Sequence, residues 1–155
     1  MVYLVKGLRS EVIYVYEINH TTKDNRKALA IGNARVIKIA IQYEKLGYLV
    51  LTNTGNHEGP DLIIVSLPDG RIRKVIEVTN YARPNEYMAD DRVSRYINCL
   101  EYFKSIKGIE LELIVSYMEN LTAKQLLEIE QFGIRVNAVG SQDLPEEKAV
   151  DGWIE

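Results

Sequence analysis

The sequence contains a single cysteine, Cys99, and only two histidines among its 155 residues. One cysteine cannot form an internal disulfide or build a cysteine-rich zinc cluster. His20 and His57 stand in polar segments, and neither has another ligand at metal-binding spacing. These absences exclude the small disulfide-stapled and zinc-ribbon classes, and they favour a reducing, cytoplasmic location.

Long apolar runs are also absent. No stretch approaches the roughly 20 apolar residues that span a bilayer. The first residues, MVYLVKGLRSEV, lack the charged start, apolar run and cleavage site of a signal peptide. No P-loop, dinucleotide fingerprint or G-x-S-x-G elbow occurs, which argues against three common enzyme classes. What remains is a chain with 46 % apolar residues, long enough for one folded domain over residues 1–155.

A strong excess of charge of one sign is missing as well, since the net charge is −3. The charge is uneven, however: residues 1–38 carry +4, residues 39–109 carry zero and residues 110–155 carry −7. A nucleic-acid partner would therefore approach the first two-thirds of the chain and avoid the last third. Ordinary solvated charge with an acidic tail fits equally well, so charge alone leaves both interpretations open.

Alternating periodicities predict strands and helices in turn. Strands are predicted at residues 2–6, 11–18, 48–51, 61–67, 71–81, 110–118 and 134–139. Helices are predicted at 26–46, at 86–107 with Asn85 as the cap, and after Thr122, where Thr-x-x-Gln forms a capping box and Gly133 ends the helix. This order is typical of an α/β fold: an N-terminal hairpin (1–19), a mixed central β-sheet flanked by helices (26–140) and an acidic tail (141–155).

The hairpin of residues 61–81 turns at Pro-Asp-Gly, residues 68–70. This tripeptide favours a three-residue loop, a type I turn followed by a left-handed glycine. Leu67 would then pair with Arg71, and Asp61 would lie directly opposite Glu77 with Cβ atoms roughly 4.5–5.5 Å apart. A two-residue Asp-Gly loop would instead send the two carboxylates to opposite faces.

Two carboxylates at so short a distance repel each other. A divalent cation removes the repulsion by binding oxygens of both. Mg²⁺ favours one or two carboxylates together with water and substrate phosphate. Alternatively, Asp61 caps a strand end and Glu77 pairs with a nearby cation. Glu77 lies inside the apolar run KVIEV, where an unpaired charge is costly, and this favours the cation site.

Other polar residues are predicted near this pair. Glu44 falls in the apolar stripe of the first helix, as a buried salt-bridge partner or a site residue. Glu86 would occupy the first turn of the second helix, as an ordinary dipole partner or a residue of the cleft. Thr79 has the strand parity of Glu77, and Asp90 is a weaker candidate one turn beyond Glu86.

Basic residues surround the predicted centre. Arg73 shares the strand parity of Glu77, and Arg83, Arg92 and Arg95 follow it in the sequence. Guanidinium groups at these positions would hold the phosphates of a nucleic-acid backbone. Each of them individually also fits a solvated surface charge.

The residues GPD ending at Asp61 and EVT from Glu77 to Thr79, on a hairpin between two helices, resemble the PD-(D/E)XK nuclease superfamily over residues 26–140. The resemblance implies a restriction-endonuclease-like core and cleavage of DNA phosphodiester bonds that depends on Mg²⁺, with Mn²⁺ as a substitute. It also implies that Asp61 and Glu77 are metal ligands and that Glu44 completes the metal site. The chain is also similar to small proteins encoded by viruses of thermophilic archaea, which would place it in a host cytoplasm.

The departure from the family is Thr79, which stands where the family has a lysine that activates the attacking water. Lys74 has the wrong strand parity to replace it. Arg92 or Arg95 could stabilise the transition state instead, and Glu86 could act as the general base.

We therefore expect a metal-dependent deoxyribonuclease. Its expected catalytic residues are Asp61, Glu77, Glu86 and Thr79, its metal ligands Asp61, Glu77 and Glu44, and its substrate-binding residues Arg73, Arg83, Arg92 and Arg95. The alternatives are a non-catalytic nucleic-acid-binding or assembly protein that retains the fold, and a structural homodimer joined through the N-terminal hairpin.

Overall fold

The computed structural model describes residues 2–6, 13–17, 34–53, 59–79 and 83–138. The rest of the chain lies outside this part, including His20, His57, residues 26–33 of the first predicted helix and the acidic tail at 141–155. No helix of the described residues is long and apolar enough to cross a membrane.

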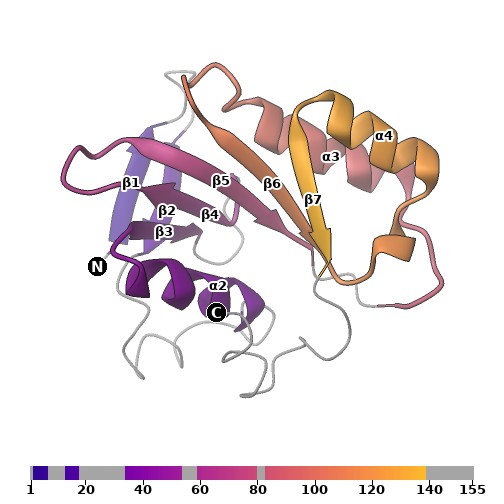
Figure 1. The fold of residues 1–155 in the computed structure, drawn as a ribbon, viewed down its shortest axis with the longest axis horizontal. Coiled ribbons are helices and arrows are strands. Elements are labelled where there is room, and N and C mark those ends of the chain that lie inside the picture. Colours follow the sequence, from indigo (N-terminus) through magenta and orange to yellow (C-terminus); the bar gives the residue numbers. More distant parts are fainter. Residues whose placement is uncertain (1, 7–12, 18–33, 54–58, 80–82, 139–155) are drawn as a thin grey trace.

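One mixed sheet of seven strands forms the centre of the molecule, and its strands lie side by side in sequence order (Figure 1). The strands are β1 (Val2–Lys6), β2 (Ile13–Glu17), β3 (Leu49–Asn53), β4 (Leu62–Val65), β5 (Ile72–Val78), β6 (Glu110–Val115) and β7 (Ile134–Ala138). Neighbours from β1 to β5 are antiparallel, whereas β5, β6 and β7 run parallel. The sheet confirms the predicted α/β class and the N-terminal hairpin.

Helices cover both faces of the sheet (Figure 1). Helix α2 (Ala34–Lys45) packs on one face; α3 (Asp90–Glu101) and α4 (Ala123–Gln131) pack on the other. The two parallel crossovers contain α3 and α4, and right-handed crossovers that advance in one direction place their helices on one face. Strand side chains alternate, so Ile76 and Val78 join the core under α2 while Val75 joins the core under α3.

The prediction for the start of the second helix was wrong. Helix α3 begins at Asp90, its N-cap position is Ala89, and Asn85 has a left-handed backbone with φ of 64°. The buried Asn120 explains the difference, because its side chain donates to the carbonyls of Arg83 and Glu86 at 2.7 and 2.9 Å. These tertiary hydrogen bonds hold residues 83–88 outside the helix and override local helix propensity.

The third helix follows the prediction. The Thr122 hydroxyl accepts from the Gln125 N–H at 3.1 Å, and the Gln125 amide oxygen accepts from the Thr122 N–H at 3.0 Å. These two bonds are the capping box read from the sequence. Phe132 ends α4, and Gly133 adopts the left-handed backbone with φ of 77° that leads the chain into β7.

The hairpin of β4 and β5 has the predicted register but not the predicted loop. Ser66 and Arg71 close the loop through a hydrogen bond of 2.9 Å, so it contains four residues, 67–70, and Leu67 does not pair with Arg71. Gly70 is left-handed as predicted, with φ of 68°. The register then shifts, because Val65 pairs with Ile72 but Ile64 pairs with Lys74. Arg73 is therefore an extra residue in β5, a bulge that restores the register.

Candidate functional site

Asp61 and Glu77 meet across the β4–β5 hairpin, as the sequence predicts. Leu62 pairs with Ile76, so the next step outward places Asp61 opposite Glu77. The Asp61 carboxylate accepts a hydrogen bond of 2.8 Å from the Val78 N–H. The Glu77 side chain is buried and is hydrogen-bonded to Asp61. We call these two residues the carboxyl pair.

The environment favours a proton on Glu77. Burial raises the pKa of the Glu77 carboxyl, and the adjacent Asp61 raises it further through a hydrogen bond and through repulsion. Hydrogen bonds from the Cys99 thiol and the Val78 N–H oppose this shift without cancelling it, so the pKa lies well above the ordinary value of 4.5. The neutral form of Glu77 avoids placing two negative charges against each other beneath α3.

Cys99 contributes to the site as a thiol. Burial raises the pKa of Cys99, and the charge of Glu77 and a hydrogen bond to it raise the pKa further. A group so strongly held in its protonated form is a weak nucleophile but a constant donor. Cys99 was not among the predicted site residues, whereas the structure places it against Glu77.

A cleft of about 580 Å³ opens above the carboxyl pair. Its lining residues among those described are Gly59, Glu77, Arg92, Arg95, Tyr96, Asn98, Cys99 and Tyr102. Six of these belong to α3 or to the residue that ends it, so one side of α3 forms a wall of the cleft. We call this space the α3 cleft.

Tyr96 connects the acidic and the basic parts of the α3 cleft. Burial raises the pKa of its hydroxyl, and the positive charge of Arg92 opposes the shift most strongly. The carboxyl pair raises the pKa and Arg95 lowers it. The Tyr96 hydroxyl is therefore close enough to the carboxyl pair, Arg92 and Arg95 for their charges to change its pKa.

Thr79 is the first residue after β5, two positions beyond Glu77, and is closed to solvent. Its N–H donates to the Ile114 carbonyl at 2.9 Å, and its carbonyl accepts from Arg35 at 3.1 Å. Its hydroxyl has no hydrogen-bond partner within the described residues and does not line the α3 cleft. The backbone of Thr79 holds the sheet together, and its side chain brings no charge to the site.

Glu44 does not join the carboxyl pair. It lies on α2, which covers the face opposite to Glu77. It also lies at the wrong end of that helix: Arg35, near the start of α2, contacts Thr79, whereas Tyr43, beside Glu44, contacts Lys74. The expectation that Glu44 completes the metal site is therefore not met by this geometry.

Glu86 and Arg83 pair with each other instead of entering the α3 cleft. Their side chains approach to 3.5 Å, with 52 % of Glu86 and 75 % of Arg83 exposed. Neither is among the described residues that line the cleft. The predicted base role of Glu86 relied on its place in the first turn of the helix, and α3 starts four residues later.

Arg73 is placed away from the carboxyl pair. It sits four residues before Glu77, at roughly 3.3 Å per residue along the strand. Its guanidinium donates to the Ser66 hydroxyl at 3.0 Å and to Asp69 at 3.1 Å. The bulge thus ties Arg73 to the hairpin tip, whereas Arg92 and Arg95 reach the α3 cleft as predicted.

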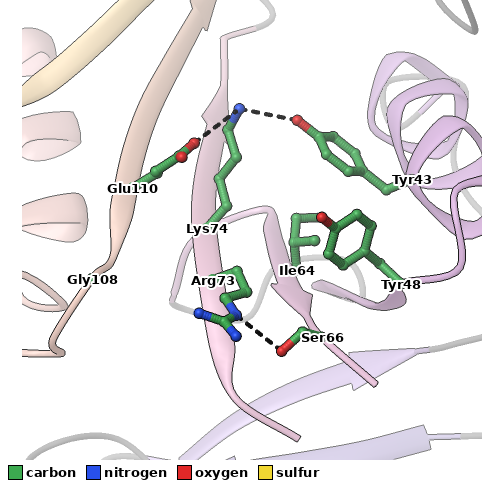
Figure 2. A pocket seen from close by; sticks show the side chains of 8 residues that line it. All are labelled: Tyr43, Tyr48, Ile64, Ser66, Arg73, Lys74, Gly108 and Glu110. Atoms are coloured by element: carbon green, nitrogen blue, oxygen red, sulfur yellow. Dashed lines mark hydrogen bonds and ion pairs between the residues drawn. The ribbon is translucent and has the colours of Figure 1, made fainter. Parts of the chain in front are cut away.

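Lys74 faces the opposite side of the sheet, as its strand parity predicts. Figure 2 shows it in a second cleft, of about 440 Å³, with its ammonium directed toward Tyr43 and Glu110. It donates to the Tyr43 hydroxyl at 3.0 Å and forms a buried ion pair of 2.5 Å with Glu112. Asn137 donates to the other oxygen of Glu112. These contacts occupy Lys74 on the α2 side, so it does not lie beside Glu77.

The residues that sequence reasoning missed are Gly59, Tyr96, Asn98, Cys99 and Tyr102. A signal for two of them, Tyr96 and Cys99, was present. Arg92, Tyr96 and Cys99 recur at helical spacing, which places them on one face of α3 together with Arg95.

Comparison with known proteins identifies no matching family model, and neither a curated protein nor a solved structure matches the chain. Within residues 34–53, 59–79 and 83–138 the structure brings together no group of three or more metal-ligating side chains. The functional argument therefore depends on the carboxyl pair and the α3 cleft.

Proposed function

We propose that the protein is a metal-dependent nuclease that hydrolyses DNA phosphodiester bonds in the α3 cleft. One observation carries this proposal: Asp61 faces Glu77 across the hairpin, and Glu77 lines a cleft whose wall presents two arginines. In this proposal the cation would bind at the carboxyl pair and the phosphate beside the arginines. The nuclease-like core that the sequence resembles belongs to the same proposal.

The carboxyl pair fits a small divalent cation. Asp61 and Glu77 face each other across the hairpin, so their oxygens could be shared by one cation. Mg²⁺ needs only one or two carboxylates when water and phosphate complete its shell, and Mn²⁺ accepts similar oxygen ligands. Asp61 and Glu77 would hold such a cation, which would make an attacking water more acidic and would stabilise negative charge on the phosphate.

The remaining residues bind and orient the substrate. Arg92 and Arg95 would each donate to phosphate oxygens, and their delocalised charge suits the developing negative charge of the transition state. The Tyr96 hydroxyl, within reach of both arginines and the carboxyl pair, would donate to the same phosphate. The two arginines would thus take over charge stabilisation from the lysine that Thr79 replaces.

A second candidate is a nucleic-acid-binding protein without catalytic activity. One observation favours it: Thr79 brings no charge to the site, and Lys74 is held on the other face. This protein would bind DNA through Arg92 and Arg95 but would leave it intact.

A cleavage assay separates the two candidates. Linear and circular DNA are incubated with the protein in Mg²⁺, Mn²⁺ or EDTA, beside Asp61→Asn, Glu77→Gln and Glu86→Gln. We expect metal-dependent cleavage that falls about 100-fold or more in the first two variants, equivalent to about 2.7 kcal/mol of lost transition-state stabilisation. Glu86→Gln is the matched control, because this exposed acid lies outside the cleft, and it should cleave normally.

Contaminating nucleases are the main alternative source of activity. Cleavage that persists in Glu77→Gln, purified and folded like the wild type, would contradict the nuclease proposal. DNA binding without cleavage in every metal would favour the second candidate.

A further inference from the structure

Access to Glu77 is narrow. The residue is 9 % exposed and lies beneath α3, so a phosphodiester must enter the α3 cleft to reach it. A volume of about 580 Å³ matches the roughly 300–1,000 Å³ of sites that enclose one small molecule. Enzymes that bind a base in a small pocket must first take that nucleotide out of the duplex stack, whereas a single strand offers an unpaired base directly.

The wall of the α3 cleft combines aromatic rings with positive charge. Tyr96 and Tyr102 are half-buried, pack against the core under α3 and also line the cleft. Tyr102 is fixed by an edge-on contact with Phe103 at 5.6 Å between ring centres. Rigid rings beside cations are the features with which proteins bind unpaired bases, since every base has a face that can stack.

The α3 cleft also presents a group for each part of a nucleotide. The Tyr96 ring belongs to the wall from which Arg92 and Arg95 reach the cleft, and its hydroxyl is within electrostatic reach of the carboxyl pair. A phosphate between the arginines and the carboxyl pair would therefore bring its own base beside Tyr96. Asn98, which also lines the cleft, carries an amide that can donate to and accept from a base edge.

We infer that the α3 cleft accepts one unpaired nucleotide, and that the protein acts on single-stranded nucleic acid in preference to intact duplex. Tyr96 stacks on the base while Arg92 and Arg95 hold its phosphate. This inference rests on the proposed function of the cleft, and it specifies the class of substrate.

Binding is measured separately from cleavage. Fluorescence anisotropy in EDTA compares a labelled single-stranded DNA of 15 nucleotides, the same sequence as RNA and the same sequence as a DNA duplex. We expect the wild type to bind a single strand at least about tenfold more tightly than the duplex. The RNA arm shows which sugar the site prefers. Equal or tighter binding of the duplex, or no binding of any strand, overturns the inference.

Variants identify the stacking residue. Tyr96→Leu keeps apolar volume but removes the ring, and we expect it to weaken single-strand binding about tenfold while duplex binding is unchanged. Tyr96→Phe keeps the ring and should retain the preference. Tyr87→Leu is the control, since Tyr87 is 66 % exposed and does not line the cleft. A folded Tyr96→Leu with wild-type single-strand affinity contradicts the role of Tyr96.

The two proposals can fail independently. Single-strand preference in EDTA with no cleavage in any metal refutes the nuclease but leaves this inference standing. Metal-dependent cleavage by a protein that prefers duplex does the reverse. If Tyr96→Leu does not fold, Arg95→Gln still tests the site, because Arg95 is exposed. Unchanged single-strand affinity in that variant counts against the cleft.

Discussion

Glu77 shows how a single side chain can make stability depend on pH. At a pH well below 4.5, the ordinary pKa of a glutamate, the Glu77 carboxyl carries its proton in both the folded and the unfolded chain. As the pH rises, the unfolded chain releases the proton first, because burial and Asp61 raise the pKa of the folded-state carboxyl. The folded protein therefore loses stability as the pH rises from about 4.5 through that raised pKa. The groups that face Glu77 are Asp61, Cys99, Tyr96, Arg92 and Arg95.

Glu77→Gln should stabilise the protein at high pH. Glutamine retains the shape and the donor of the protonated acid, so it can donate to Asp61 without acquiring a charge. In thermal melts we expect a Tm at least about 2 °C above wild type at pH 8 and a difference below about 1 °C at pH 4. Mn²⁺ at pH 8 should raise the Tm of wild type but not of the variant. Glu86→Gln serves as the control. Identical melting curves for the wild type and Glu77→Gln at pH 8 would contradict a raised pKa for Glu77.

At the scale of elements, the position of α3 decides whether its arginines face the cleft. Gln125 on α4 fixes the start of α3, because its amide donates to the Met88 carbonyl at 3.0 Å and to Asp90 at 2.7 Å. The same side chain closes the capping box with Thr122. A buried glutamine thus connects the two helices that cover one face of the sheet.

Gln125→Ala should therefore be more harmful than the loss of a cap. The change leaves the Met88 carbonyl and the Thr122 N–H without their partner, and we expect the free energy of unfolding to fall by about 2–3 kcal/mol. Urea denaturation measures the effect. Lys124→Ala, at an exposed position one residue earlier, is expected to change it by less than about 0.5 kcal/mol. If both variants lowered the free energy of unfolding by a similarly small amount, the connection between α3 and α4 through Gln125 would be ruled out.

The β4–β5 hairpin shows what the sequence can and cannot predict. The Pro-Asp-Gly turn predicted a three-residue loop, and counting outward from that loop placed Asp61 opposite Glu77. The loop was predicted one residue too short, and the bulge at Arg73 compensated for the error. Bulges leave no local signature here, so the positions of Arg73 and its partner Asp69 could not be read from the chain.

The prediction of where α3 starts was wrong for a different reason. Helix propensity and a cap-like Asn85 favoured an early start, but Asn120, 35 residues later in the chain, binds the backbone of residues 83–86. Such a contact belongs to tertiary structure, and periodicity carries no information about it. The role of Glu86 was lost together with this boundary, whereas Arg92 and Arg95 kept their place on the correct helical face.

For the molecule as a whole, charge is separated along the chain. The segment that contains the carboxyl pair and the α3 cleft, residues 39–109, is neutral overall, and residues 110–155 carry −7. Long-range attraction therefore gives little help to a nucleic acid, and affinity must come from a few local contacts. Weak dependence on salt is the expected consequence.

Salt titration counts these contacts. For single-stranded DNA, each neutralised phosphate contributes about −0.7 to the slope of log affinity against log salt. We expect Arg92→Gln and Arg95→Gln each to reduce the steepness of the wild-type slope by about 0.7. Arg73→Gln, which alters a guanidinium bound to the hairpin tip, should leave the slope unchanged. If only Arg73→Gln reduced the steepness of the salt dependence, the nucleic acid would bind at the other end of β5 instead.

The bulge at Arg73 has a consequence for how the protein tolerates change. The bulge takes up the extra loop residue before the strand pairs that position Asp61 and Glu77. A change at the hairpin tip therefore need not alter the register of those pairs. We expect that a reporter group attached at the exposed Leu67 would leave the carboxyl pair aligned. The tip is therefore a suitable place from which to observe the site without disturbing it.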